Sequence, residues 1–171
     1  MKLLTLSGST RPESSTKRLL KALALSATQF DWIEAPALDT LPLFSPTRLA
    51  EGKPDACVVL AKAVEDADVV IIATPEYAHN MPAALKSALE WCVASGEFSR
   101  KQVVAITSTP NAPRGEKCMQ SLVWTLQALD AQILVEAPIY GAGKGVTEQY
   151  EVTDPTIKEM LEAILDLLSA S

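Results

Sequence analysis

Short apolar runs alternate with amphipathic segments along most of the chain. Two of the runs, residues 69–73 (VVIIA) and 103–106 (VVAI), contain no polar residue. Unbroken runs of this kind are typical of strands that are covered on both faces in a parallel sheet. Together the runs predict five strands, over residues 2–7, 30–35, 68–74, 102–108 and 131–137.

The amphipathic segments between the runs predict helices. In the first of them, Leu19, Leu20 and Leu23 recur at helical spacing. Asn80 is expected to cap the third helix, with Pro82 in its first turn, and Thr153 or Asp154 is expected to cap the last. The predicted helices cover residues 15–27, 54–66, 81–95, 115–129 and 154–168.

Two connecting segments carry turn residues and predict loops. Residues 38–52 are punctuated by Pro and Ser, and residues 141–145 (GAGKG) are rich in glycine. Between these loops, strands and helices alternate, so right-handed crossovers place helices on both faces of one sheet. The sequence predicts an α/β fold with five parallel strands in the order 2-1-3-4-5, as one domain over residues 1–171.

Composition narrows the class of protein. Hydrophobic residues make up 48% and charged residues 21%, which is the profile of a soluble globular protein. The net charge of −6 disfavours nucleic acid, because such partners need clustered Lys and Arg. No run of 18 apolar residues predicts a membrane span, and residues 1–6 are expected to form a strand rather than a signal peptide.

The three cysteines favour a reducing compartment. Cys57, Cys92 and Cys118 lie far apart, without a CxxC pair and with only one histidine in the chain, so a zinc site is not expected. All three fall in apolar, helix-like stretches, where a reduced cysteine acts as a small hydrophobe. We therefore expect a cytoplasmic protein without a metal.

The segment after the first predicted strand is suited to a phosphate. Gly8 permits a tight exit from the strand, and five Ser and Thr hydroxyls precede or open the next helix. A helix N-terminus attracts anions, and Arg11 can pair with phosphate oxygens in a planar fork. The alternatives are an ordinary capping cluster and a solvated Arg11. Neither a G-x-G-x-x-G fingerprint nor a Walker loop is present.

The segment after the third predicted strand is suited to a flat ring. Pro75 fixes its own φ, and the backbone groups that follow are expected to be free to pair with the edge of a heterocycle. Tyr77 offers an apolar wall or is a half-buried packing residue. Glu76 is a general acid or, as we favour, a carboxylate that braces the loop. His79 is expected to be an exposed loop residue. With the first segment, this loop predicts a mononucleotide site.

Together the two segments resemble the NADPH-dependent FMN reductase family, which includes FMN, quinone, chromate and azo-dye reductases. The first motif is G-S-x-R-x-x-S-x-T at residues 8–16, followed by Leu19. The second is P-E-Y at residues 75–77, followed by Pro82, Leu85, Lys86 and Trp91. The resemblance covers residues 2–135 and implies a flavodoxin-like three-layer sandwich.

The resemblance also implies the cofactors and the site. FMN would be bound, NAD(P)H would be the cosubstrate, and hydride would pass to FMN and on to a small acceptor such as a quinone. No protein acid or base is required, so no catalytic side chain is expected. The phosphate would be held by Ser9, Arg11, Ser14, Ser15 and Thr16. The isoalloxazine would be lined by Pro75, Glu76, Tyr77 and Ala78, with Ser108 and Thr109 facing it from another loop.

Two alternatives stay open, together with the oligomeric state. A flavodoxin-type electron carrier would have a hydroxyl-rich phosphate loop without an arginine such as Arg11. A degenerate member that binds a partner protein and little flavin is supported by departures from the motif at Ala78, Ala83 and residues 110–115. The resemblance implies a homodimer or homotetramer, for which the predicted helix with Trp91 is either an interface element or ordinary sheet packing.

Overall fold

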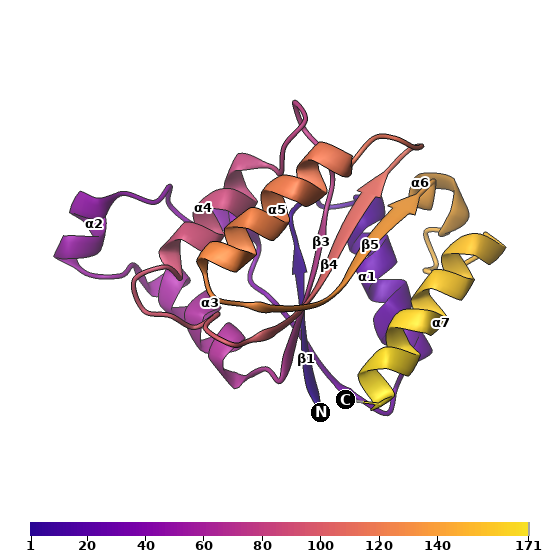
Figure 1. Cartoon of the computed structure of the whole chain (residues 1–171), viewed down its shortest axis with the longest axis horizontal. Helices are drawn as coiled ribbons and strands as arrows, with labels where there is room; N and C mark the ends of the chain where they lie inside the picture. Colours follow the sequence, from indigo (N-terminus) through magenta and orange to yellow (C-terminus); the bar gives the residue numbers. More distant parts are fainter. Residues whose placement is uncertain (171) are drawn as a thin grey trace.

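A twisted parallel sheet runs through the centre of the molecule in the computed structural model, which describes residues 1–170 (Figure 1). The five strands are hydrogen-bonded in the order β2-β1-β3-β4-β5, so the predicted α/β fold and strand order are confirmed. All neighbouring strands pair in parallel. In that order the strands are Asp31–Glu34, Lys2–Ser7, Val69–Thr74, Gln102–Thr109 and Gln132–Tyr140.

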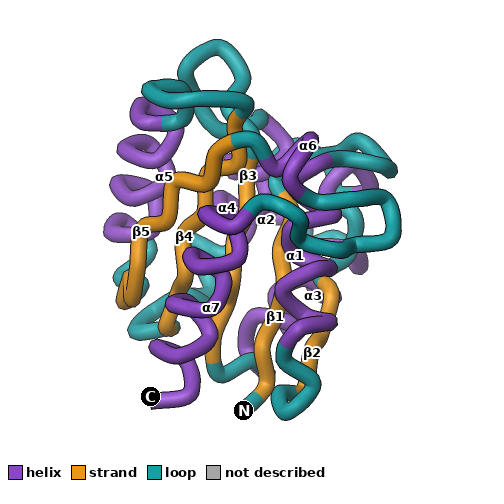
Figure 2. The backbone as a smooth tube through the Cα atoms, turned by 90° about the vertical axis from the view of Figure 1, so that its right-hand side faces the viewer, coloured by secondary structure: helices purple, strands orange, loops and turns teal. Residues whose placement is uncertain are grey.

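Helices cover both faces of the sheet, and side chains along each central strand point alternately to the two layers. On β3, Val70 and Ile72 pack with α3 (Asp55–Asp66), α4 (Ala83–Trp91) and α5 (Glu116–Ala128). The intervening residues of β3 pack with α1 (Ser15–Ser26) and α7 (Pro155–Ala170), which lie in front of the strands in Figure 2. Every residue of β3 is buried, as its apolar run predicts.

Both predicted loops contain helical turns, which corrects the sequence analysis. Residues 38–52 include η1 (Leu38–Thr40) and α2 (Pro46–Glu51), and residues 141–145 include α6 (Ala142–Gly145). The reason in the first case is a local cap: the Ser45 hydroxyl accepts from the Arg48 amide, and Pro46 occupies the first turn. Proline is favoured there, because an N-terminal N–H has no intrahelical partner.

Helix α4 is shorter than predicted, and the expected cap is wrong. Pro82 occupies the N-cap position of α4, whereas the Asn80 Oδ1 atom accepts from the Met81 amide at 2.8 Å. Trp91 ends the helix inside the protein: its Nε1 donates to the Pro42 carbonyl at 2.8 Å, and its ring meets Phe44 edge to face. Of the two alternatives for Trp91, the structure supports packing, because only 1% of this residue is exposed.

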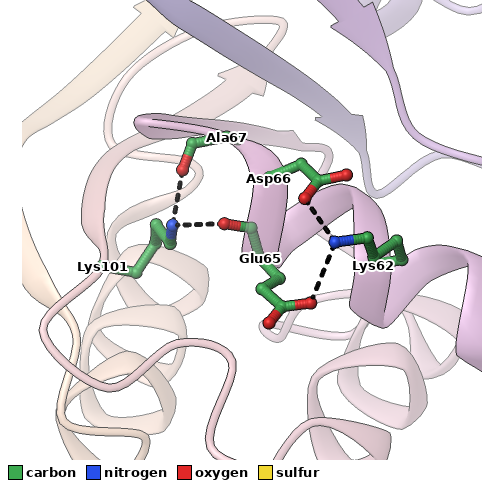
Figure 3. Close-up of polar contacts among 5 residues, drawn as sticks. All are labelled: Lys62, Glu65, Asp66, Ala67 and Lys101. Carbon is green, nitrogen blue, oxygen red and sulfur yellow. Dashed lines mark hydrogen bonds and ion pairs between the residues drawn. The ribbon is translucent and has the colours of Figure 1, made fainter.

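At the amino-terminal ends of the strands, a lysine side chain links two elements through backbone carbonyls. Lys101, just before β4, donates to the carbonyls of Glu65 and Ala67 at the end of α3 (Figure 3). On the surface of α3, Lys62 pairs with Asp66 at 2.6 Å and with Glu65 at 3.3 Å. The contacts of Lys101 hold the end of α3 to the start of β4, at the end of the sheet opposite the cavity described next.

Candidate functional site

A cavity of about 380 Å³ lies at the carboxyl ends of the central strands. Segments that follow β1, β3 and β4 form its walls, at the point in a doubly wound sheet where ligands bind. Its lining includes all eleven of the predicted site residues, which come from three separate parts of the sequence. The lining residues are Ser9, Arg11, Ser14, Ser15, Thr16, Pro75, Glu76, Tyr77, Ala78, His79, Ser108, Thr109, Pro110 and Arg114.

One end of the cavity is formed by the N-terminus of α1. Ser14 is the N-cap of this helix, and its Oγ accepts from the Lys17 amide at 3.1 Å. The Ser9 Oγ accepts from the Arg11 amide at 3.4 Å. Ser9, Ser14 and Thr16 are buried and still line the cavity. A helix N-terminus, hydroxyls and a guanidinium together suit an anion.

The loop after β3 is a tight hairpin turn. Tyr77 and Asn80 exchange two backbone hydrogen bonds of 2.8 and 2.9 Å, so their backbone groups are not free, contrary to the prediction. Ala78 and His79 between them have φ values of 50° and 60°, as in a type I′ turn. Tyr77 is 48% exposed and lines the cavity.

Glu76 joins this loop to the next one. Its side chain is 9% exposed, and its Oε2 accepts from the Gly115 amide at 3.0 Å, directly before α5. A carboxylate at a helix N-terminus is stabilised by the backbone N–H groups there. His79 Nδ1 lies 3.7 Å from the other carboxylate oxygen, and the imidazole is 73% exposed. The structure therefore supports the bracing role of Glu76 and the exposed role of His79.

The segment after β4 supplies cavity residues that sequence reasoning missed. Arg114 and Pro110 line the cavity with His79, although none was predicted to do so. Gly115 has a φ of 97°, and a Cβ there would lie 3.0 Å from the Thr107 Oγ1, so this turn requires glycine. The sequence carried one signal for Arg114. Residues 110–115 depart from the family's glycine-rich pattern, and this arginine is part of the departure.

The cysteine near the cavity is inert. Cys118 is buried, and its Sγ donates to the Pro75 carbonyl at 3.6 Å. Burial, aided by the negative charge of Glu76, raises the pKa of this thiol to about 12. A thiol with that pKa is protonated at neutral pH and is not a nucleophile. Burial likewise raises the pKa of Cys92 to about 12, as expected of a cysteine that acts as a small hydrophobe.

The fold is a flavodoxin-like α/β fold, with a cavity whose one end is lined by hydroxyls, a guanidinium and a helix N-terminus. The family model for NADPH-dependent FMN reductase matches residues 1–144, and the chain belongs to this family.

Relatives agree with this membership, and a solved structure has the same fold. A quinone reductase of Escherichia coli (strain K12) is 28% identical over 166 residues, which cover 95% of this chain and 86% of that protein. An NAD(P)H-dependent FMN reductase of Pseudomonas aeruginosa is 28% identical over 173 residues, with 98% and 93% covered. The flavoenzyme FerB, an NAD(P)H:(acceptor) oxidoreductase from Paracoccus denitrificans, has the same fold, with a TM-score of 0.86, 22% identity and coverage of 96% and 93%.

The residues at the cavity fit FMN. The N-terminus of α1 and the Arg11 guanidinium match a dianionic phosphate. At the other end, Pro75 and Tyr77 offer apolar surface to a flat ring. As a member of the family, the chain is a flavin-dependent oxidoreductase that uses FMN and NAD(P)H.

Proposed function

We propose that the cavity binds FMN with its phosphate at the N-terminus of α1 and its isoalloxazine between the loops after β3 and β4. One observation carries this proposal: a single cavity gathers the hydroxyls, the guanidinium and the ring-side loops of both motifs. Ser9, Arg11, Ser14, Ser15 and Thr16 bind the phosphate. Pro75, Glu76, Tyr77, Ala78, Ser108 and Thr109 line the ring.

The protein orients the reactants and leaves the redox chemistry to the cofactor. When bound, FMN supplies the capacity to accept and donate hydride. The hairpin turn places the Tyr77 wall beside the cavity, and the Glu76 bond to Gly115 fixes the distance between the two ring-side loops. No side chain is assigned as an acid or a base.

The acceptor, the compartment and the assembly belong to the same proposal. The matched relatives named above include a quinone reductase, so we propose a quinone or a similar small molecule as acceptor. They do not favour the carrier or the degenerate alternative.

Free, buried cysteines among the described residues support a reducing, cytoplasmic location. No described helix is long and apolar enough to cross a membrane. We also propose a homodimer or homotetramer.

The test is a titration of the purified protein with FMN, followed by anaerobic reduction. Wild type should bind FMN, lose the flavin absorbance on addition of NADH or NADPH, and regain it when a quinone is added. Arg11→Ala should weaken FMN binding by about 1.5–3 kcal/mol, the value of a charge-assisted hydrogen bond. The control is Arg100→Ala. Arg100 lies before β4, at the amino-terminal ends of the strands and away from the cavity, so this variant loses the same charge but should keep its FMN affinity. Equal affinities for wild type and Arg11→Ala would contradict the phosphate role.

A further inference from the structure

The cavity contains two guanidinium groups, and the proposed phosphate site uses one of them. Arg11 follows β1, whereas Arg114 follows β4. Strand β3 lies between β1 and β4, so the two segments leave the sheet about two strand spacings apart, roughly 10 Å. Arg114 therefore belongs to the ring-side end of the cavity.

The backbone of Arg114 is fixed while its side chain is free. Its amide donates to the Asn111 carbonyl at 3.1 Å, and its carbonyl accepts from the Thr109 hydroxyl at 2.9 Å. The next amide, that of Gly115, is held by Glu76. Within residues 1–170, the Arg114 guanidinium forms no ion pair, not even with the neighbouring Glu76. A cation on a rigid turn faces the cavity and is not neutralised by the protein.

The overall charge makes this local cation significant. The chain carries a net charge of −6, which repels a polyanionic cosubstrate at long range. The groups at the N-terminus of α1 are already assigned to the FMN phosphate, so Arg114 is left for another ligand. A nicotinamide dinucleotide that approaches the ring brings its own phosphates to this end, and arginine pairs with phosphate oxygens in a bidentate fork.

We propose that Arg114 binds a phosphate group of the nicotinamide dinucleotide and thereby sets the affinity of the site for its cosubstrate. The inference rests on the proposed function, because it takes the phosphate end of the cavity as occupied by FMN. It assigns the two arginines different ligands: Arg11 binds the cofactor, and Arg114 binds the cosubstrate.

Calorimetric titrations with the oxidised dinucleotides NAD⁺ and NADP⁺ test this assignment without turnover. Each titration is run on wild type and on Arg114→Ala, with and without FMN. Arg114→Ala should weaken dinucleotide binding roughly 10- to 100-fold while FMN affinity stays unchanged. If the affinities for NAD⁺ and NADP⁺ fall equally, Arg114 binds the pyrophosphate. If only the affinity for NADP⁺ falls, Arg114 binds the 2′-phosphate. Either result supports the proposal. Arg114→Lys keeps the charge but not the fork and should fall between the two proteins.

The control is Arg100→Ala, which removes an arginine at the other end of β4 and should behave as wild type. Unchanged dinucleotide affinity in Arg114→Ala would overturn the proposal. So would weaker FMN binding with unchanged dinucleotide binding. Failure of the proposed function gives a different result, since wild type itself would then not bind FMN.

Discussion

Gly8 lies at a point between β1 and β3 that has no room for a side chain. A Cβ there would lie 2.5 Å from the Thr74 Oγ1 and 3.0 Å from the Leu85 Cδ2. Gly8→Ala should therefore force the two loops apart and lower the free energy of unfolding by about 1–3 kcal/mol, as overpacking of a dense interior does. Urea denaturation of the protein without FMN measures this change.

Gly143→Ala is the matched control for this substitution. Its Cβ would lie 3.9 Å from the nearest atom outside its own helix, the Ser15 Cβ, which is an ordinary contact. Because Gly143 lies within α6, alanine there should be neutral or stabilise the protein by up to about 1 kcal/mol. If Gly8→Ala and Gly143→Ala had equal stability, the packing at Gly8 would not be as tight as the structure indicates.

At the scale of single residues, sequence reasoning found the side chains whose chemistry follows from position alone. Ser14 could be predicted because an N-cap and an anion site use the same place at a helix start. Arg114 and His79 could not, because whether they face the cavity depends on the turns at residues 111–114 and 77–80. No short-range pattern specifies the left-handed φ of Ala78.

Among the elements, the Glu76 carboxylate connects the β3 loop to the start of α5. Glu76→Ala removes the acceptor of the Gly115 amide and should cost about 1.5–3 kcal/mol of stability, the range for a hydrogen bond to a charged group. Glu76→Gln keeps an oxygen acceptor and should lose less. Amide exchange at Gly115 reports the bond directly: it should speed up in Glu76→Ala, and unchanged exchange would show that the bond does not hold this turn.

A second connection between elements makes stability depend on pH. Lys53, before α3, donates to Glu97, before β4, at 2.8 Å, and both side chains are largely buried. Burial opposes the charge on Glu97, but the bonds from Lys53 and Ser95 prevail and hold its pKa below the usual range. A pKa lowered by folding stabilises the protein above the unfolded-state pKa, and this stability is lost as pH falls through the folded-state value.

Lys53→Met should therefore lower stability at pH 7 and reduce the further loss on acidification. Urea midpoints at pH 7 and at about pH 3, which is below the usual pKa of a glutamate side chain, measure both effects. Lys62→Met is the control, because Lys62 pairs with Asp66 at the exposed surface of α3, where solvent screens the pair. An equal response of the two variants would mean that the partly buried pair contributes no more than the exposed one.

The strands were easier to predict than the connections between them. Residues 69–74 and 103–109 are buried, and the apolar runs at 69–73 and 103–106 identify these two strands. Residues 38–52 combine turn residues with a short capped helix, and a six-residue helix leaves little periodicity to detect. Helix α6 is shorter still, and its two glycines favour a loop when the sequence is considered alone.

For the whole molecule, strand order accounts for the site. Because β1 and β3 are neighbours, residues 8–16 and 74–82 meet at the carboxyl ends of these strands, although α1, β2, η1, α2, α3 and β3 separate them in the sequence. The predicted order already implied this meeting.

The exposed apolar surface could not be predicted in the same way. The sequence indicated Trp91 as a candidate interface residue, whereas the exposed tryptophan is Trp124, which is 61% exposed on α5. Val93, which is 59% exposed just after α4, lies beside it.

The proposed assembly can be tested on that surface. The exposed apolar side chains of Trp124, on α5, and Val93, just after α4, would be covered if a second copy packed against this face. Trp124→Ser should then shift the protein toward monomers at micromolar concentration, while the unfolding midpoint of the monomer changes little, because Trp124 contributes little to the core. Light scattering coupled to size exclusion measures the mass. Leu25→Ser, 56% exposed on α1 across the sheet, is the control and should leave the mass unchanged. Dissociation by Leu25→Ser alone would place the interface on the opposite face, and a wild type that is monomeric at all concentrations would exclude the assembly.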